Sequence, residues 1–126
     1  MQSKLLALLQ PDDQSRAEEA LSDEVVFHSP VRDYHGRADV AHLVSTIAGV
    51  VNEITAQREF AADREIVTII TASHGGRLMD GVLYETHDTA GRIERATLLL
   101  RPLSTLRQAI AEMGAALEQS PLPSRR

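Results

Sequence analysis

Apolar residues recur at helical spacing in two long stretches of the chain. In the first stretch, which begins at Ala38, the spaced apolar positions are Val40, Leu43, Val44, Ile47, Val51 and Ile54. In the second stretch they are Leu103, Leu106, Ile110, Met113 and Leu117. Side chains three or four positions apart lie on the same side of a helix, so each stretch predicts a helix with one apolar face. Ser104 is a candidate N-cap for the second of these helices.

Two shorter helices are predicted near the start of the chain. Residues 3–10 form the first of them. The second follows a candidate capping box made by Ser15 and Glu18. Its apolar positions are Ala17, Ala20 and Leu21.

Runs rich in β-branched residues predict strands in the rest of the chain. Residues 24–30 form a short strand that Pro30 ends, because proline has no N–H to give to a ladder. A loop follows at residues 32–37, and an edge strand with a turn at residues 56–64. Three further strands cover residues 64–73, 78–87 and 92–102, with glycine-containing turns at residues 74–77 and 88–91. The order α-α-β-α-β-β-β-β-α predicts the α+β class.

The two turns predict which residues of the last three strands face each other. The first turn places Ser73 opposite Leu78, and the second places Tyr84 opposite Arg95. One face is then apolar at its centre and is expected to pack against the helices. Its residues are Ile66, Thr68, Ile70, Ala72, Met79, Gly81, Leu83, Ala96, Leu98 and Leu100, with Glu85 and Glu94 near the second turn, where solvent is expected to reach them.

The opposite face, which includes Ile93 by alternation, mixes apolar and polar side chains. A large mixed patch on an open sheet is typical of a contact surface. We therefore expect a homodimer that forms through this outer face. The residues expected at the dimer contact are Thr71, Asp80, Tyr84, Arg95, Thr97 and Arg101.

Composition narrows the class of protein. The 126 residues fit one domain, expected at residues 1–118, and the polar, proline-broken tail at residues 119–126 is expected to be disordered. The formal net charge of −5, without a basic stripe, argues against nucleic acid as a partner. The absence of cysteine suits a reducing compartment. No stretch has the length of a signal-peptide core or a membrane span, so we expect a cytoplasmic protein without membrane contact.

Three stretches resemble the nuclear-transport-factor-2-like superfamily: LSDEVVFHSPVRDYHGRADVAHLV, DGVLYETHDTAGRI and RPL. The superfamily includes ketosteroid isomerases, SnoaL-like polyketide cyclases and epoxide hydrolases. The resemblance implies a cystatin-like cone, in which a curved antiparallel sheet wraps around helices and leaves a pocket at its mouth. For this chain it implies a pocket for a small hydrophobic molecule. Its expected lining is Ile70, Met79, Leu83, Leu98 and Leu100.

The catalytic residues of ketosteroid isomerases are replaced at the matching positions. Ser29 stands where that family has its proton-shuttling aspartate, and Leu83 where it has the acid that donates to the oxyanion. The oxyanion tyrosine of the family falls near Leu5, in a helix without tyrosine. A serine hydroxyl is no substitute for a carboxylate base. Isomerase chemistry of this type is therefore not expected.

His28 and Tyr34 are the remaining catalytic candidates. An imidazole on the first strand, with an ordinary pKa near ~6.5, could serve as a general base. Tyr34 could orient a ligand oxygen from the rim of the pocket. The alternatives are that His28 bonds to the backbone or a nearby carboxylate, and that Tyr34 covers the edge of the core.

A metal site is not expected, and neither is a cofactor. His28, His35 and His42 recur every seven residues, but a strand holds the first and a helix the last, and no acid stands at ligand spacing with them. Three functions remain open: a dimeric binder of a small hydrophobic molecule, an enzyme acting on a small hydrophobic carbonyl or epoxide with His28 as base, and a pure dimerisation or interaction module.

Overall fold

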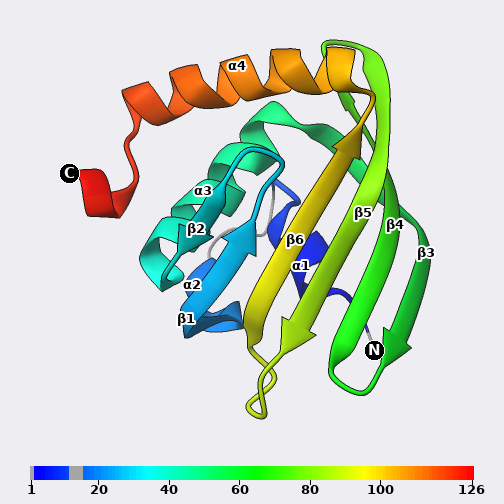
Figure 1. Cartoon of the computed structure of the whole chain (residues 1–126), viewed down its shortest axis with the longest axis vertical. Helices are drawn as coiled ribbons and strands as arrows, with labels where there is room; N and C mark the ends of the chain where they lie inside the picture. Colours follow the sequence, from blue (N-terminus) through cyan, green and yellow to red (C-terminus); the bar gives the residue numbers. More distant parts are fainter. Residues whose placement is uncertain (1, 12–15) are drawn as a thin grey trace.

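Six strands form one sheet that curves around helices on its inner side (Figure 1). The computed structural model describes residues 2–11 and 16–126. The strands are β1 (Leu21–His28), β2 (Asp33–His35), β3 (Asn52–Ala62), β4 (Glu65–His74), β5 (Arg77–His87) and β6 (Ile93–Arg101). Their order in the sheet is β2-β1-β6-β5-β4-β3. Because β1 and β6 run parallel, the sheet is mixed and not wholly antiparallel as expected.

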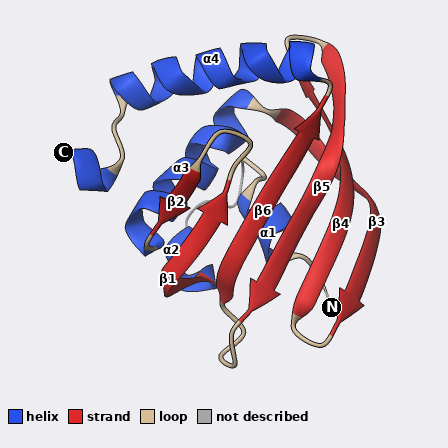
Figure 2. Ribbon diagram, viewed as in Figure 1, coloured by secondary structure: helices blue, strands red, loops and turns tan. Residues whose placement is uncertain are grey.

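The helices lie on the inner side and at one end of the sheet (Figure 2). They are α1 (Lys4–Leu8), α2 (Ala17–Ala20), α3 (Arg37–Val50) and α4 (Leu103–Gln119), followed by a 3₁₀ turn, η1 (Pro123–Arg125). The helix α3 packs against β1, and α4 crosses the end of the sheet that lies opposite the β5–β6 turn. This arrangement is the α+β cone that the sequence predicts.

The core lies between the inner sheet face, α1 and α3. Phe27, Leu43, Ile70 and Leu83 are among its fully buried side chains. Alternation along β4 matches the predicted faces, since Ile70 is buried whereas Ile69 is 38% exposed. Burial of this apolar set supplies the main favourable free energy of folding.

The register of the sheet matches the prediction in one hairpin and differs in the other. Ser73 pairs with Leu78, as expected. Tyr84 pairs with Thr97 and not with Arg95, a shift of two residues along β6. Because side chains alternate with a period of two, this shift keeps each of them on the expected face.

The face assignment fails only beside the β5–β6 turn. The ladder is irregular between Thr86 and His87, where β6 begins. An irregularity of one residue reverses the alternation. Ile93 is therefore fully buried instead of facing outward. Glu94 is exposed, as expected beside the turn, but it does not take the expected inward face.

Glycine is required at the centre of β5. A Cβ on Gly81 would lie 1.9 Å from the backbone oxygen of Leu99 on the neighbouring strand. Glycine in a strand interior allows such a close approach of two backbones. The β4–β5 turn uses glycine differently, because Gly75 and Gly76 both have positive φ, of 58° and 77°.

Several expected boundaries were wrong, and one short strand was missed. The helix α3 ends at Val50, before Val51 and Ile54 of the predicted stripe. Both residues are buried, but Ile54 lies in β3. A half-buried strand end therefore gives the same apolar spacing as another helical turn. The short strand β2 was expected to be loop, because its three residues, DYH, carry no strand pattern.

The tail expected to be disordered packs against α3 instead. Leu122 is 7% exposed and belongs to the core. Asp39 on α3 accepts hydrogen bonds from the backbone N–H of Ser124 at 3.0 Å and from its hydroxyl at 2.5 Å. One apolar anchor and two hydrogen bonds thus fix residues that composition alone marks as polar and proline-broken. Ser15 of the predicted capping box lies outside the described residues.

In the parts of the chain that the structure covers, no helix combines the length and the apolar character needed to cross a membrane.

Candidate functional site

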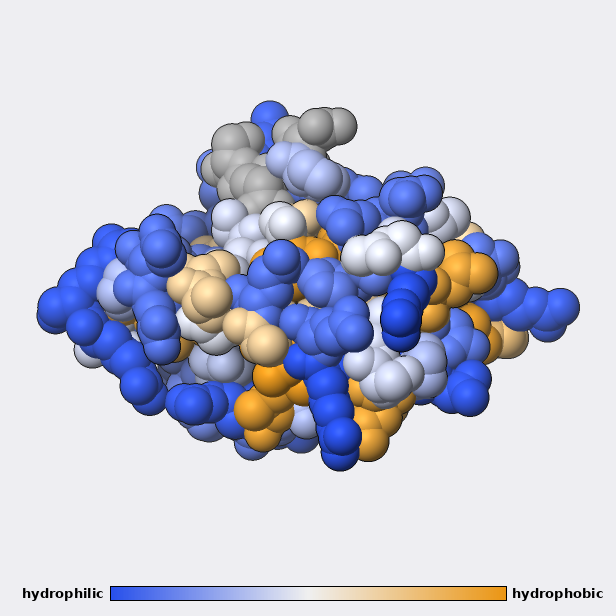
Figure 3. All heavy atoms as spheres, turned by 90° about the horizontal axis from the view of Figure 1, so that it is seen from above, coloured by the Kyte–Doolittle hydropathy of each residue, from blue (hydrophilic) through white to orange (hydrophobic). Residues whose placement is uncertain are grey.

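An apolar pocket lies where α3, α4, β6 and the β1–β2 loop meet. Its volume is about 260 Å³. We call it the mouth pocket, because it lies at the end of the sheet that α4 crosses. Its walls include Leu43 and Ile47 from α3, Leu98 and Leu100 from β6, and Ile110 and Met113 from α4. On the side that faces the viewer in Figure 3, polar side chains surround separate small groups of apolar ones.

The residues expected to line the pocket divide into two groups. Leu98 and Leu100 do line the mouth pocket. Ile70, Met79 and Leu83 line none of the described pockets and are 0–2% exposed in the packed core. The side chains of α1 and α3 fill the deeper part of the cone. The space that remains is therefore shallow and lies under α4.

Tyr34 is the main polar side chain of the mouth pocket. It pairs with Phe27 across β2 and β1, which puts both side chains on the inner face of the sheet. The guanidinium of Arg32 lies 5.9 Å from the centre of the Tyr34 ring, in a cation–π contact. Both residues line the pocket. The predicted position of Tyr34 at the pocket rim agrees with this geometry.

Ser29 also lines the mouth pocket, but its hydroxyl is used in the β1–β2 turn. It donates to the carbonyl of Arg32 at 2.7 Å and accepts from the backbone N–H groups of Val31 and Arg32, at 3.2 and 3.1 Å. No histidine or carboxylate from the described residues lines this pocket. The pocket can therefore bind and orient an apolar molecule, but it offers no general base.

His28 does not reach the mouth pocket, and the prediction that it acts there as a base was wrong. It pairs with Thr97 on β6 and Asp33 on β2, which places it on the outer face of the sheet. Its Nδ1 lies 2.7 Å from the carboxylate of Asp33. The adjacent Phe27 takes the inward position, because successive strand residues point to opposite faces. His28 thus agrees with the alternative given in the sequence analysis, in which it bonds to a nearby carboxylate.

The residues expected at a dimer contact share the outer face of the sheet. Asp80 pairs with Thr71 on β4 and with Arg101 on β6, and its carboxylate lies 3.3 Å from the Arg101 guanidinium. Tyr84 and Thr97 form the next polar pair. Arg95 lies nearer the β5–β6 turn, opposite Thr86.

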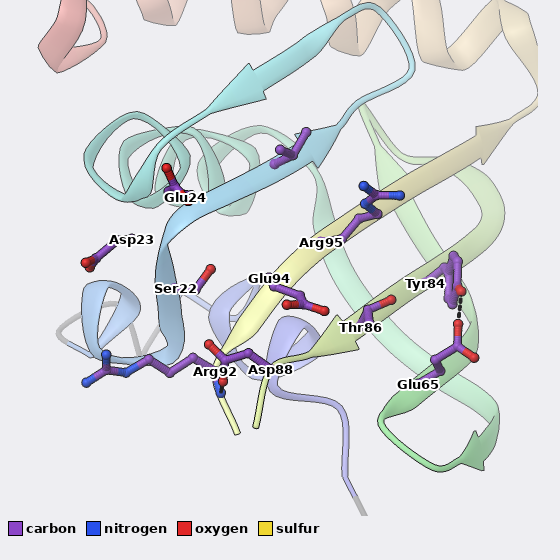
Figure 4. A pocket seen from close by; sticks show the side chains of 11 residues that line it. Ser22, Asp23, Glu24, Glu65, Tyr84, Thr86, Asp88, Arg92, Glu94 and Arg95 are labelled. Carbon is purple, nitrogen blue, oxygen red and sulfur yellow. Dashed lines mark hydrogen bonds between the residues drawn. The ribbon is translucent and has the colours of Figure 1, made fainter. Parts of the chain in front are cut away.

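A polar groove of about 850 Å³ lies on this outer face near the β5–β6 turn (Figure 4). Tyr84 donates its hydroxyl to Glu65, and this hydrogen bond raises the pKa of the Tyr84 phenol above its ordinary value of 10.0. At the turn, backbone N–H groups, chiefly that of Arg92, lower the pKa of Asp88. The charged side chains along the groove are Asp23, Glu24, Glu65, Asp88, Glu94, Arg92 and Arg95.

A buried carboxylate lies on the inner face, near α1. Glu85 is 0% exposed, although solvent was expected to reach it. It accepts hydrogen bonds from the Ser3 hydroxyl at 2.5 Å and from the backbone N–H groups of Lys4 and Leu5, at 2.9 and 3.3 Å. The Nε2 atom of His87 lies 2.8 Å from it. Alternation predicts the inward direction of Glu85, but only the packing of α1 over the sheet shows that it is buried.

The histidines that recur every seven residues do not meet. His42 on α3 hydrogen-bonds through Nε2 to the carbonyl of Ser120, 2.7 Å away, far from the contact of His28 with Asp33. In residues 2–11 and 16–126 the structure has no cluster of three side chains suited to hold a metal ion.

Comparison with solved structures identifies the fold. A steroid delta-isomerase from Pseudomonas aeruginosa matches with a TM-score of 0.82 and 26% identity, over 93% of this chain and 94% of that one. An uncharacterised protein with a cystatin-like fold from Silicibacter pomeroyi matches with a TM-score of 0.86 and 20% identity, over 93% and 84%. A nuclear-transport-factor-2-like protein of unknown function from Cytophaga hutchinsonii matches with a TM-score of 0.68 and 12% identity, over 82% and 88%.

No protein-family model matches the chain, and no curated protein matches it. The chain has the cystatin-like cone fold of nuclear-transport-factor-2-like and SnoaL-like proteins. A fold of this kind does not by itself assign an activity.

Proposed function

We propose that this protein binds a small apolar molecule in the mouth pocket. The observation that carries the proposal is the lining, in which aliphatic side chains from α3, β6 and α4 surround a space beside a single phenol, Tyr34. Pockets for small molecules commonly combine apolar walls with a few polar groups that orient the ligand. In this proposal the Tyr34 hydroxyl orients a ligand oxygen.

The volume of the pocket limits the size of the ligand. An apolar protein cavity of about 150 Å³ is large enough to hold benzene. At about 260 Å³, the mouth pocket has room for one aromatic ring with a short side chain. It is small for a molecule with several fused rings.

Methionine methyl groups provide a direct test, because two of the three methionines differ in their relation to the pocket. Met113 lines the mouth pocket, whereas Met79 is 2% exposed in the core and does not line it. Protein labelled with ¹³C at the methionine methyl groups is titrated with 3-phenylpropionamide. The Met113 signal is expected to move and saturate, while the Met79 signal stays in place.

A variant that fills the pocket supplies the control. Gly114 lines the pocket, and a Cβ there would meet no atom within 4 Å, so Gly114→Leu adds a side chain without a close backbone contact. Ala115→Leu adds the same side chain at an exposed position on the same helix. Gly114→Leu is expected to abolish the movement of the Met113 signal, and Ala115→Leu to preserve it. Saturable binding that is equally strong in both variants, or no binding in the wild type, contradicts the proposal.

We also propose that two copies of the chain associate through the outer sheet face. Ile69, Val82 and Leu99 form one row across β4, β5 and β6. Ile69 is 38% exposed and Leu99 is 56% exposed. An exposed apolar row inside a polar rim is typical of protein contact surfaces.

Sedimentation velocity tests this association. Leu99→Arg is expected to shift the protein to the monomer, because it places a charge in the centre of the row. Arg107→Glu, on an exposed part of α4, is the control for a surface charge change. A concentration of 100 micromolar is on the order of the dissociation constant of a weak complex. A wild type that still sediments as a monomer at this concentration would refute the association.

A further inference from the structure

A second cavity adjoins the mouth pocket and is here called the vestibule. This vestibule has a volume of about 320 Å³. It shares four lining residues with the mouth pocket: Arg32, Tyr34, Gly114 and Leu117. The two cavities are therefore neighbours on either side of these residues, and a ligand that occupies both would pass Tyr34.

The vestibule is positively charged, although the chain as a whole carries a formal charge of −5. Its charged lining residues are Arg32, Arg125 and Glu118, which gives two positive charges, one negative charge and a sum of +1. Neither arginine forms an ion pair with an acid in the part of the chain that the structure describes. Two guanidinium groups thus line the vestibule without an ion pair to a carboxylate of the described residues.

The side chain of Arg32 and the backbone turn that carries Arg125 both make defined contacts. The Arg32 guanidinium lies over the ring of Tyr34 in a cation–π contact at 5.9 Å, and Tyr34 lines both cavities. Arg125 lies in η1, next to Ser124, whose two hydrogen bonds to Asp39 fix this turn on α3. Guanidinium groups suit carboxylates, because their N–H groups match the two oxygens of the anion.

We propose that the ligand is an apolar monocarboxylate, with its ring or chain in the mouth pocket and its carboxylate between Arg32 and Arg125. This inference rests on the proposed function, because it assigns the chemical class of the molecule that the mouth pocket holds. The carboxylate stays partly in solvent in the vestibule, so the body of the ligand supplies most of the affinity.

Three probes of one shape test the assignment in the Met113 titration. They are 3-phenylpropionate, the neutral 3-phenylpropionamide and the cationic 3-phenylpropylamine. A single solvent-exposed ion pair contributes little to the binding free energy. With two such pairs, we expect the anion to bind about tenfold more tightly than the amide at low salt. The amine is expected to bind more weakly than the amide. The advantage of the anion should shrink at about 0.5 M salt, because salt screens exposed charges.

Matched variants show whether the two arginines cause the preference. Arg32→Met and Arg125→Met keep an unbranched side chain but remove the charge, and each is expected to reduce the preference about threefold. The double variant should bind the acid and the amide equally. Arg126→Met is the control, because Arg126 is adjacent in sequence but does not line the vestibule.

The two proposals fail in different ways. Equal affinity of the wild type for acid and amide, with a Met113 response to both, overturns the carboxylate assignment and leaves the mouth pocket as a binding site. A preference for the acid that survives in the double variant also overturns it. Absence of a Met113 response to all three probes overturns the proposed function, and the carboxylate assignment with it.

Discussion

The buried carboxylate of Glu85 is expected to hold α1 on the sheet, and its substitution tests how much this contact contributes. Three donors from the start of α1 converge on it: the Ser3 hydroxyl and the backbone N–H groups of Lys4 and Leu5. His87 completes the set from the same strand. Because Glu85 is 0% exposed, water cannot replace it as the acceptor for these groups.

The magnitude follows from the number and burial of these hydrogen bonds. A buried donor left without an acceptor costs about 1–3 kcal/mol. Glu85→Leu leaves the Ser3 hydroxyl, two backbone N–H groups and the His87 ring without their acceptor. Part of that loss is relieved if α1 moves away from the sheet. We therefore expect the free energy of unfolding to fall by about 3–5 kcal/mol, against a typical total of about 5–15 kcal/mol.

Glu85→Gln separates the charge from the hydrogen-bond geometry. The amide oxygen can still accept from Lys4 and Leu5, and the amide nitrogen can approach the Ser3 hydroxyl. Only the extra strength of bonds to a charged acceptor is then lost, so we expect a decrease of about 1–2 kcal/mol. Glu94→Gln makes the same change at an exposed position of β6 and is expected to alter stability by less than about 0.5 kcal/mol.

Urea unfolding and amide hydrogen exchange together test this reasoning. The order of stability should be wild type and Glu94→Gln first, then Glu85→Gln, then Glu85→Leu. The amides of Lys4 and Leu5 should lose protection in Glu85→Leu before those of the central strands do. If Glu85→Leu unfolds at the same urea concentration as Glu94→Gln, the carboxylate does not anchor α1.

Three further predictions concern the strands and turns that frame the site. Gly81→Ala should destabilise the protein by about 3 kcal/mol or more in urea unfolding, because the new Cβ would overlap the backbone oxygen of Leu99. As a control, a Cβ at Gly49 in α3 meets no atom within 4 Å, so Gly49→Ala should stabilise the protein by up to about 1 kcal/mol. In a variant whose other tyrosine is replaced by phenylalanine, the phenol absorbance should report a Tyr84 pKa above 10.0, and Glu65→Gln should lower it. Because the folded-state pKa of this phenol is raised, the stability it contributes is present below its unfolded pKa and is lost as pH rises through its folded pKa. Ser29→Ala should cost about 1 kcal/mol in unfolding and leave the Met113 titration unchanged, since its hydroxyl bonds only to its own turn; a loss of binding would show that Ser29 contacts the ligand.

Alternation and helical spacing were sufficient to predict most of the fold. They predicted the inner face of β4 and β5 and the two long helices, because each of these elements buries one continuous apolar face. They failed where one element packs against another that is distant in sequence. At the start of β6, an irregularity in the ladder exchanges the faces of Ile93 and Glu94, and no sequence pattern marks that irregularity. The tail packs against α3 through Leu122, an isolated apolar residue between two prolines.

The candidate site could be predicted only in part, for a related reason. Leu98, Leu100 and Tyr34 line the mouth pocket as expected. The apolar spacing of α4 predicts a packed helix face, but Met113 is a wall of the pocket. Periodicity cannot separate a side chain that fills a core from one that borders a cavity. Arg32 lies in the loop at residues 32–37, two positions before Tyr34, so the sequence does show a cation near the expected pocket rim. Its proposed role depends on the position of Arg125, 93 residues further along the chain.

The placement of acids on the inner sheet face explains why binding is a better proposal than acid–base catalysis. Glu85 is the fully buried carboxylate on that face within the described chain, and its hydrogen bonds are taken up by α1 and His87. It lies near α1 and is not part of the mouth-pocket lining. A carboxylate held by backbone donors cannot move to accept a proton from a ligand elsewhere in the cone. In the proposed complex, the polar groups near the ligand are therefore Tyr34 and the arginines of the vestibule, and an arginine can orient an anion without taking a proton from it.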